Sequence, residues 1–161
     1  MEKVLPRTLL TAYLLVLTWL ILFKFSFDLT SVLIDHQSQS VNLIPFVDGG
    51  SREMIDNIIV FIPFGLLLSV NLKQTGFWEK LFYIFTFSLA AEVIQFVLAI
   101  GTTDITDVIA NTFGGLLGLT FYKLTKKYID SKKIDLVITV IGTVLLLSLV
   151  LLRVLFLRVR Y

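Results

Sequence analysis

Residues 81–124 read LFYIFTFSLAAEVIQFVLAI, then GTT, then DITDVIANTFGGLLGLTFYKL, and this stretch decides the fold. It holds two mostly apolar runs of about 20 residues each, and either run is long enough to cross a bilayer as a helix. The runs are continuous rather than alternating, which favours helices over the strands of a barrel. We therefore expect an antiparallel transmembrane hairpin with a tight turn at residues 101–103.

The same apolar character runs through the rest of the chain. Of its 161 residues, 57% are hydrophobic and 16% are charged, and the mean hydropathy is +0.90. A water-soluble fold of this size could not keep so many apolar side chains out of water. The apolar runs predict five transmembrane spans, over residues 8–27, 54–72, 81–100, 104–124 and 136–157. The predicted fold class is all-α, a polytopic transmembrane helix bundle that forms a single membrane domain over residues 1–161.

Two of these spans have features of their own. Lys3 and Arg7 precede the first span, as they would in a signal peptide, but no small-residue cleavage site follows it. We therefore expect a retained anchor. Pro63 and Gly65 lie in the middle of the second span and predict a kink there.

The positions of Lys and Arg orient the bundle, because short loops rich in these residues stay in the cytoplasm. They gather at the amino terminus and in the second and fourth connections, as Lys3, Arg7, Lys73, Lys80, Lys123, Lys126, Lys127, Lys132 and Lys133. These segments are expected to be cytoplasmic, and the first and third connections to face outward. The carboxyl-terminal tail carries Arg153, Arg158 and Arg160, so its outward position departs from the rule. The long first connection, residues 28–53, contains an apolar patch at 41–46, which favours a re-entrant or interfacial segment.

The composition excludes several kinds of function. Cysteine is absent, which removes disulfides, thiolate metal sites and thiol nucleophiles. The formal net charge of +2, with no soluble basic segment, argues against nucleic acid as a partner. The single histidine, His36, is expected to be an ordinary loop residue. Zinc sites and serine-hydrolase triads are therefore disfavoured.

Polar side chains inside spans are costly, so each is a candidate functional residue or an interhelical contact. Helical periodicity places Ser88, Glu92, Gln95 and Ala99 on one stripe of the third span, and Asp104, Asp107, Asn111, Gly115 and Gly118 on one stripe of the fourth. Gly114 and Gly118 form a small-xxx-small pair, which predicts close packing against a neighbouring helix.

The depth of these residues follows from the helical rise of about 1.5 Å per residue. This rise predicts that Glu92 lies level with Asn111 and that Gln95 lies near Asp107. The outer part of the second span adds further polar groups, and the resulting candidate ligand-binding residues are Glu92, Gln95, Asp104, Asp107, Asn111, Asp56, Asn57, Arg52 and Glu53. We expect three helices to direct these groups into one outward-opening pocket, with the first and fifth spans as scaffold.

Several carboxylates in a pocket of low dielectric constant cannot all ionise without compensation. The sequence leaves three solutions open: a bound Mg²⁺ or Ca²⁺ held by Glu92, Asp104 and Asp107, a cationic ligand group, or carboxyl groups that stay protonated for proton transfer. Acidic residues at the start of a helix also cap it, which is the structural interpretation of Asp104 and Asp107, and of Glu53 and Asp56.

Four blocks of this chain together resemble the VanZ-like family of bacterial membrane proteins, and in particular its teicoplanin-resistance branch. The blocks are residues 42–46 (NLIPF), 52–57 (REMIDN) continuing into 61–65 (FIPFG), 92–96 (EVIQF), and 104–107 (DITD) with Asn111, Gly114 and Gly115. They cover residues 42–118 in the family's order and spacing. The wider family often has an arginine and a further acidic residue where this chain has Thr102 and Thr106, a departure that matches the teicoplanin branch.

The resemblance implies a multi-pass protein of the bacterial cell membrane that confers low-level resistance to the glycopeptide teicoplanin. The leading hypothesis is a non-catalytic protein whose pocket binds an envelope lipid, a lipid-linked cell-wall precursor or the lipoglycopeptide itself. One alternative is a membrane enzyme that modifies such a precursor or a phospholipid through Asp104, Asp107 and Glu92. Another is a small transporter with a cation or proton site at Glu92.

Overall fold

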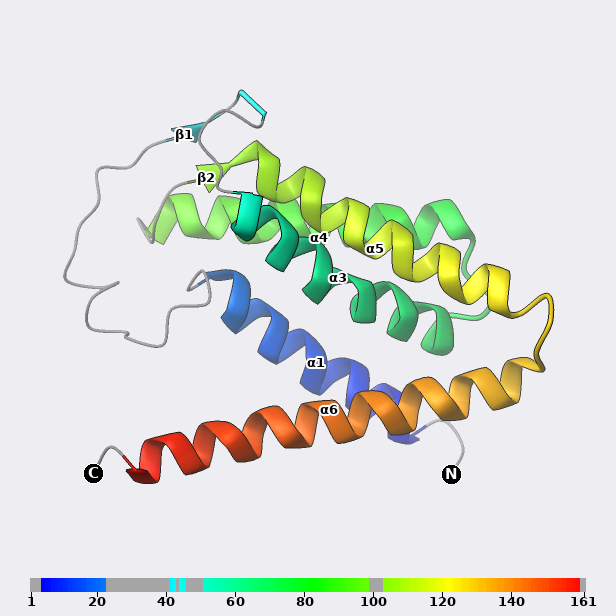
Figure 1. Ribbon diagram of the computed structural model, residues 1–161. Coiled ribbons are helices and arrows are strands. Elements are labelled where there is room, and N and C mark those ends of the chain that lie inside the picture. The colour runs from blue at the N-terminus through cyan, green and yellow to red at the C-terminus, as the bar shows by residue number, and fades with distance from the viewer. Residues whose placement is uncertain (1–3, 23–40, 43, 46–50, 99–102, 160–161) are drawn as a thin grey trace.

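The computed structural model describes residues 4–22, 41–42, 44–45, 51–98 and 103–159, and these residues form a helical bundle (Figure 1). The helices are α1 (Val4–Leu22), α3 (Ser51–Asn71), α4 (Phe77–Leu98), α5 (Ile105–Thr125) and α6 (Ser131–Val159). Two short strands, β1 (Val41–Asn42) and β2 (Thr103–Asp104), pair in parallel. The described residues hold five helices in the order of the five predicted spans, and the helix ends differ from the predicted limits by at most about five residues. The loop at 28–40, including His36, lies outside the described residues.

Successive helices run in opposite directions, so the bundle has two distinct ends (Figure 1). We call the end where α3 and α5 begin and α4 finishes the polar end. The basic end is the opposite one, where α5 finishes and α4 and α6 begin. The amino terminus lies at the basic end and the carboxyl terminus at the polar end.

Local capping fixes where three of the helices begin. Asp104 precedes α5, and its side chain accepts a hydrogen bond from the backbone N–H of Thr106. Glu79 reaches back to the N–H of Gly76 at 3.1 Å ahead of α4. Asp130 accepts a hydrogen bond from the N–H of Lys132 at 3.0 Å at the start of α6. Each carboxylate satisfies a donor that the first helical turn leaves without a partner.

The surface of the bundle is apolar, as a protein surrounded by lipid requires. Helix α4 exposes large hydrophobic side chains along its length, among them Phe82, Leu89, Val93 and Val97. Among the described residues, three helical segments are long and apolar enough to cross a membrane: Val4–Leu22, Arg52–Asn71 and Phe77–Leu98. Helix α5 is not one of them, because the buried face described below makes it more polar.

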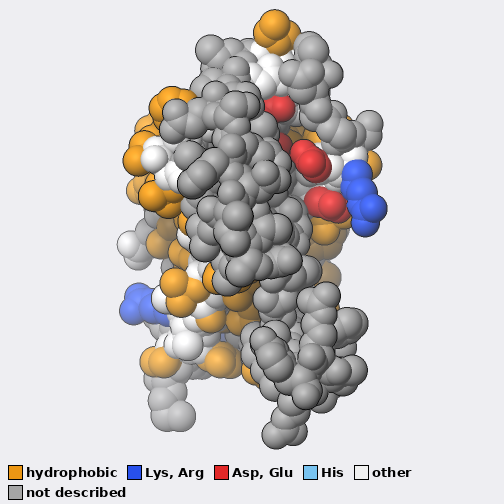
Figure 2. Space-filling view, turned by 90° about the vertical axis from the view of Figure 1, so that its left-hand side faces the viewer, with side chains coloured by type: hydrophobic (Ala, Val, Ile, Leu, Met, Phe, Trp, Pro, Cys, Tyr) orange, Lys and Arg blue, Asp and Glu red, His pale blue; other side chains and the backbone are white. Residues whose placement is uncertain are grey.

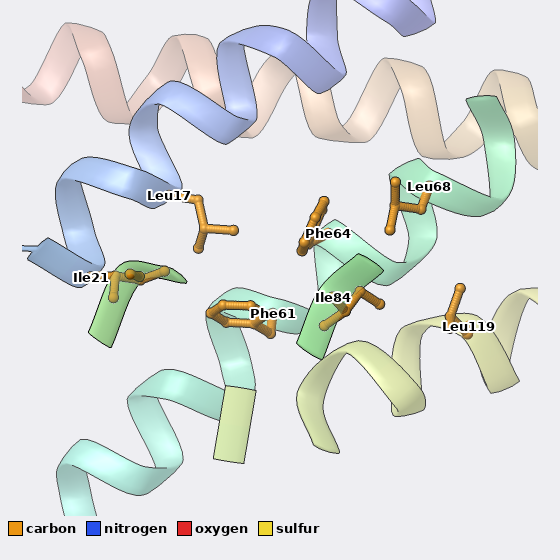
Figure 3. Packing of buried hydrophobic residues seen from close by; sticks show 8 residues of the cluster. Leu17, Ile21, Phe61, Phe64, Leu68, Ile84 and Leu119 are labelled. Atoms are coloured by element: carbon orange, nitrogen blue, oxygen red, sulfur yellow. The ribbon is translucent and has the colours of Figure 1, made fainter. Parts of the chain in front are cut away.

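The hydrophobic core lies between α1, α3, α4 and α5 (Figure 3). It consists of Leu17, Ile21, Phe61, Phe64, Leu68, Ile84, Ala91 and Leu119. Phe61 and Phe64 meet edge to face, with ring centroids 5.9 Å apart. Helix α3 contributes more of these residues than any other helix and lies at the centre of the cluster.

Helix α3 continues through Pro63 as one helix. A proline inside a helix leaves the carbonyl four residues earlier, here that of Ile59, without its N–H partner. The hydroxyl of Tyr13 in α1 donates to the adjacent carbonyl, that of Val60. A polar group from a neighbouring helix thus supports the backbone at the proline, as is usual in membrane proteins.

Helices α3 and α5 pack more closely than any other pair, and glycines make this contact. A Cβ atom at Gly114 would lie 2.3 Å from the carbonyl oxygen of Ile58, and one at Gly118 would lie 2.2 Å from that of Ile62. From the other side, a Cβ at Gly65 would lie 2.3 Å from the carbonyl oxygen of Gly115. The predicted close packing at Gly114 and Gly118 is confirmed, and α3 is the helix that they contact.

Replacing Gly118 with alanine should destabilise the protein by about 1–3 kcal/mol, because the new methyl group would collide with backbone that cannot move alone. Gly142→Ala in α6 is the matched control, since its Cβ would meet only the end of the Leu9 side chain, at 3.1 Å. That change should be neutral or slightly stabilising. Thermal unfolding of the purified variants in one detergent measures both, and equal melting temperatures would contradict the packing.

Candidate functional site

The polar side chains predicted from the sequence gather at the polar end, on α3, α4 and α5. Figure 2 looks onto this end and shows acidic side chains toward one side of it, beside a basic one. Most of the candidates are buried: Asn57 (7% exposed), Glu92 (2%), Gln95 (1%), Asp104 (7%), Asp107 (8%) and Asn111 (0%). The stripes predicted for the third and fourth spans therefore face the protein and not lipid. Ala99 lies outside the described residues.

Asp104 connects three elements at the centre of this cluster. Its Oδ1 accepts a hydrogen bond from the backbone N–H of Thr106 at 2.8 Å, and its Oδ2 accepts one from Nδ2 of Asn42 at 3.3 Å. Its own backbone N–H donates to Oε2 of Glu92 at 3.1 Å. The pairing of β1 with β2 places Asn42 directly beside Asp104. The start of α5 is thus connected to α4 and to β1 through one residue.

Two further hydrogen bonds tie α5 to its neighbours. Asn57 in α3 donates from Nδ2 to Oδ1 of Asp107 at 2.8 Å. Asn111 donates from Nδ2 to the hydroxyl oxygen of Ser88 in α4 at 2.9 Å. Both bonds are buried, and an interhelical hydrogen bond between side chains in a membrane contributes about 0.6–2 kcal/mol.

Helix α1 also takes part in the cluster, which the sequence analysis did not predict. The Nε2 group of Gln95 donates to the carbonyl oxygens of Ile21 and Leu22, at 3.0 Å and 3.5 Å, in the last turn of α1. Gln95 was expected to lie near Asp107, but its amide group is used instead to bind α1. The first span, expected to be scaffold, thus also supplies backbone acceptors to the cluster. No local sequence signal marks backbone carbonyls at a helix end as partners.

The predicted depths of Glu92 and Asn111 are wrong by about one helical turn. Asn111 lies level with Ser88, whereas Glu92 lies level with the start of α5. The reason is that α4 extends past the start of α5, and β2 runs back alongside its last turns (Figure 1). The depth estimate assumed that both helices end at the same level.

Hydrogen-bond donors surround the carboxylates and lower the cost of burying them. Asp107 receives an amide group, Asp104 receives an amide group and a backbone N–H, and Glu92 receives a backbone N–H. Asp104 and Asp107 also lie at the start of α5, where the helix dipole favours negative charge. Hydrogen-bond donors and the helix dipole thus offer a fourth way to stabilise these carboxylates. The three ways considered from the sequence were a bound metal ion, a cationic ligand group and protonation.

The geometry offers no support for the predicted Mg²⁺ or Ca²⁺ ligands. Within the described part of the chain, no three Asp, Glu or His side chains lie close enough together to hold a metal ion. Glu92, Asp104 and Asp107 therefore do not form a ready metal centre.

Three oxygen atoms in or beside the cluster are buried without a hydrogen-bond partner among the described residues. They are Oε1 of Gln95, Oδ1 of Asn111 and the hydroxyl oxygen of Thr103. An unsatisfied buried group costs about 1–3 kcal/mol. The two amide oxygens can only accept hydrogen bonds. The site as a whole is therefore rich in acceptors and suited to groups that donate.

The remaining candidates form the rim of the cluster. Arg52 and Glu53, in the first turn of α3, have exposed side chains, and that of Asp56 is partly exposed. They lie within about one and a half turns of Asn57 along α3 and are accessible from the polar end. The structure thus divides the predicted site into a buried cluster and an exposed rim.

Comparisons with known proteins point to one family. Residues 10–126 match the model of the VanZ/LLP1 family, and this segment contains every buried residue of the cluster. "Protein VanZ" of Enterococcus faecium is 52% identical over 162 residues, a match that covers 100% of this chain and 99% of that protein. No solved structure matches the chain. The chain belongs to the VanZ/LLP1 family.

Proposed function

We propose that this chain is a bacterial membrane protein that confers low-level resistance to the glycopeptide teicoplanin. The observation that carries the proposal is its 52% identity to Protein VanZ over the full length of both chains. The family resemblance in the sequence assigns teicoplanin resistance to this branch. The apolar surface of the bundle and its three membrane-length helices fit a protein that works within the cell membrane.

The buried cluster is the site at which this protein acts, in our proposal. A cluster that only held the helices together would pair all its acceptors with its own donors. Here the oxygens of Gln95 and Asn111 remain without donors in the described structure, next to the carboxylates of Glu92, Asp104 and Asp107. We infer a ligand that brings hydroxyl, amide or ammonium donors and has an apolar part that stays in lipid. An envelope lipid, a lipid-linked cell-wall precursor and the antibiotic itself share this chemistry.

The polar end faces outward in this proposal, and the amino terminus is cytoplasmic. Seven lysines lie at the basic end, where the connections between helices are short. The positive-inside rule places such connections in the cytoplasm. The buried cluster would then open toward the outer leaflet, where cell-wall precursors are used and where the antibiotic arrives.

Glu92→Gln and Asp104→Asn should each abolish protection against teicoplanin. Glu92→Gln keeps an oxygen for the N–H of Asp104, and Asp104→Asn keeps one for the N–H of Thr106 while losing the weaker bond from Asn42. The fold should therefore survive while the negative charge is lost. The measurement is the minimum inhibitory concentration of teicoplanin in a sensitive host that expresses each variant at equal membrane abundance. Both values should fall to that of cells without the protein.

Glu79→Gln provides the matched control for this experiment. It makes the same change from carboxyl to amide at the basic end, where Glu79 caps α4. This variant should protect as well as the starting protein. Full protection by both Glu92→Gln and Asp104→Asn would show that the cluster serves the structure alone.

The orientation can be measured directly because the chain has no cysteine. A single cysteine at an exposed position of each end, Glu53→Cys and Lys127→Cys, reports which side that end faces. In intact cells, a membrane-impermeant maleimide should label only Glu53→Cys, and both variants should react after the cells are opened. Labelling of Lys127→Cys in intact cells would show that the basic end faces outward, opposite to the orientation proposed.

A further inference from the structure

The basic end carries far more positive than negative side chains. The basic residues described there are Arg7, Lys73, Lys80, Lys123, Lys126, Lys127, Lys132 and Lys133, and the acidic ones are Glu79, Asp130 and Asp135. The positive-inside rule explains an excess of lysine in cytoplasmic connections. It does not explain where the individual side chains lie.

The three carboxylates of this end are already engaged elsewhere. Glu79 accepts a hydrogen bond from the N–H of Gly76, and Asp130 accepts one from the N–H of Lys132. Asp135 binds the ammonium group of Lys73 and the hydroxyl group of Tyr122. Within the described residues, Lys73 is the one basic residue of this end with an ion-pair partner, so Lys80, Lys123 and Lys126 lack one, as do the other basic residues there.

Lys80 is an unusual member of this group because it is buried. It lies in the first turn of α4 and is 8% exposed, one turn before Ile84 of the core. Lys126, just after the end of α5, is close enough for the two positive charges to repel. A lysine that is largely buried beside a like charge is stabilised by an anion that reaches its ammonium group.

The surroundings of Lys80 place it at the level of lipid headgroups. Trp78 is 75% exposed, and tryptophan in such a position is typical of the membrane–water interface. The Nζ atom of Lys123 lies 5.2 Å from the centre of the Phe77 ring, in the same turn of α4. Lys80 and the ammonium group of Lys123 thus lie at the start of α4, beside an exposed tryptophan of the kind found at lipid headgroups.

We propose that Lys80, Lys123 and Lys126 form a binding site for the phosphodiester group of an anionic phospholipid in the leaflet at the basic end. The phosphate oxygens would compensate the charge of Lys80 at the rim of the bundle. The acyl chains would lie against the apolar outer face of α4, where Phe82 is exposed. This site is separate from the polar cluster and does not depend on the function proposed for it.

Quenching of Trp78 by brominated lipid tests the proposal in the full chain. The protein has two tryptophans, so Trp19→Phe leaves Trp78 as the reporter. The variant is reconstituted in phosphatidylcholine vesicles with a minor fraction of phosphatidylglycerol, and either lipid carries the bromine in turn. At equal mole fractions of the brominated lipid, brominated phosphatidylglycerol should quench Trp78 fluorescence more strongly than brominated phosphatidylcholine. Lys80→Gln and Lys126→Gln should each weaken the preference roughly tenfold, because each removes one charge-assisted hydrogen bond to the phosphate.

Matched variants separate a specific site from diffuse charge. Lys127→Gln and Lys133→Gln remove the same charge from exposed positions at the same end and should leave the preference unchanged. Lys80→Arg keeps the positive charge and should retain the preference for phosphatidylglycerol. Melting temperatures equal to that of the Trp19→Phe protein show that the variants are folded. Equal quenching by the two lipids would overturn the proposal, as would equal losses in Lys127→Gln and Lys80→Gln. Loss of the preference on adding inorganic phosphate at constant ionic strength would overturn the lipid as the ligand.

Discussion

The contact between the backbones of α3 and α5 is the constraint on which the rest of this structure depends. Gly114 and Gly118 lie against the carbonyl groups of Ile58 and Ile62, where any side chain would collide. In a membrane, helices gain little from hydrophobic burial, so close backbone approach supplies much of their attraction. The contact fixes α5 beside α3 in one register. That register brings Asp107 of α5 to Asn57 of α3 at the polar end.

The polar end shows how a membrane protein can bury several carboxylates without a metal-binding cluster among its described residues. Asn42 and Asn57 donate to Asp104 and Asp107, and the first turn of α5 adds backbone N–H groups. These donors are fixed by the helices and by the β1–β2 pair, so the charges need no rearrangement to be stabilised. The same network leaves amide oxygens without donors in its interior. A ligand that supplies donors would therefore meet a site that is already formed.

The sequence was sufficient to predict the helices, the buried faces of α4 and α5, and the packing glycines, because each depends on the local pattern of residues. It could not predict that α4 extends past the start of α5, since this depends on how the connecting residues fold back. The one-turn error for Glu92 and Asn111 has this cause. It also could not predict that Gln95 binds the end of α1, because Ile21 and Leu22 contribute only backbone carbonyls. Hydrophobic patterns predict which face of a helix is buried, whereas the pairing of polar groups depends on tertiary structure.

Cross-linking across the α3–α5 contact tests the central claim most directly, because the chain has no cysteine of its own. In native membranes, Asn57→Cys with Asp107→Cys should be joined rapidly by a short bifunctional thiol reagent. Asn57→Cys with Phe113→Cys should not, since Phe113 is 48% exposed on the outside of α5. Adding Gly118→Ala should slow the first reaction by separating the helices. Equal rates for the two pairs, or no effect of Gly118→Ala, would contradict the account.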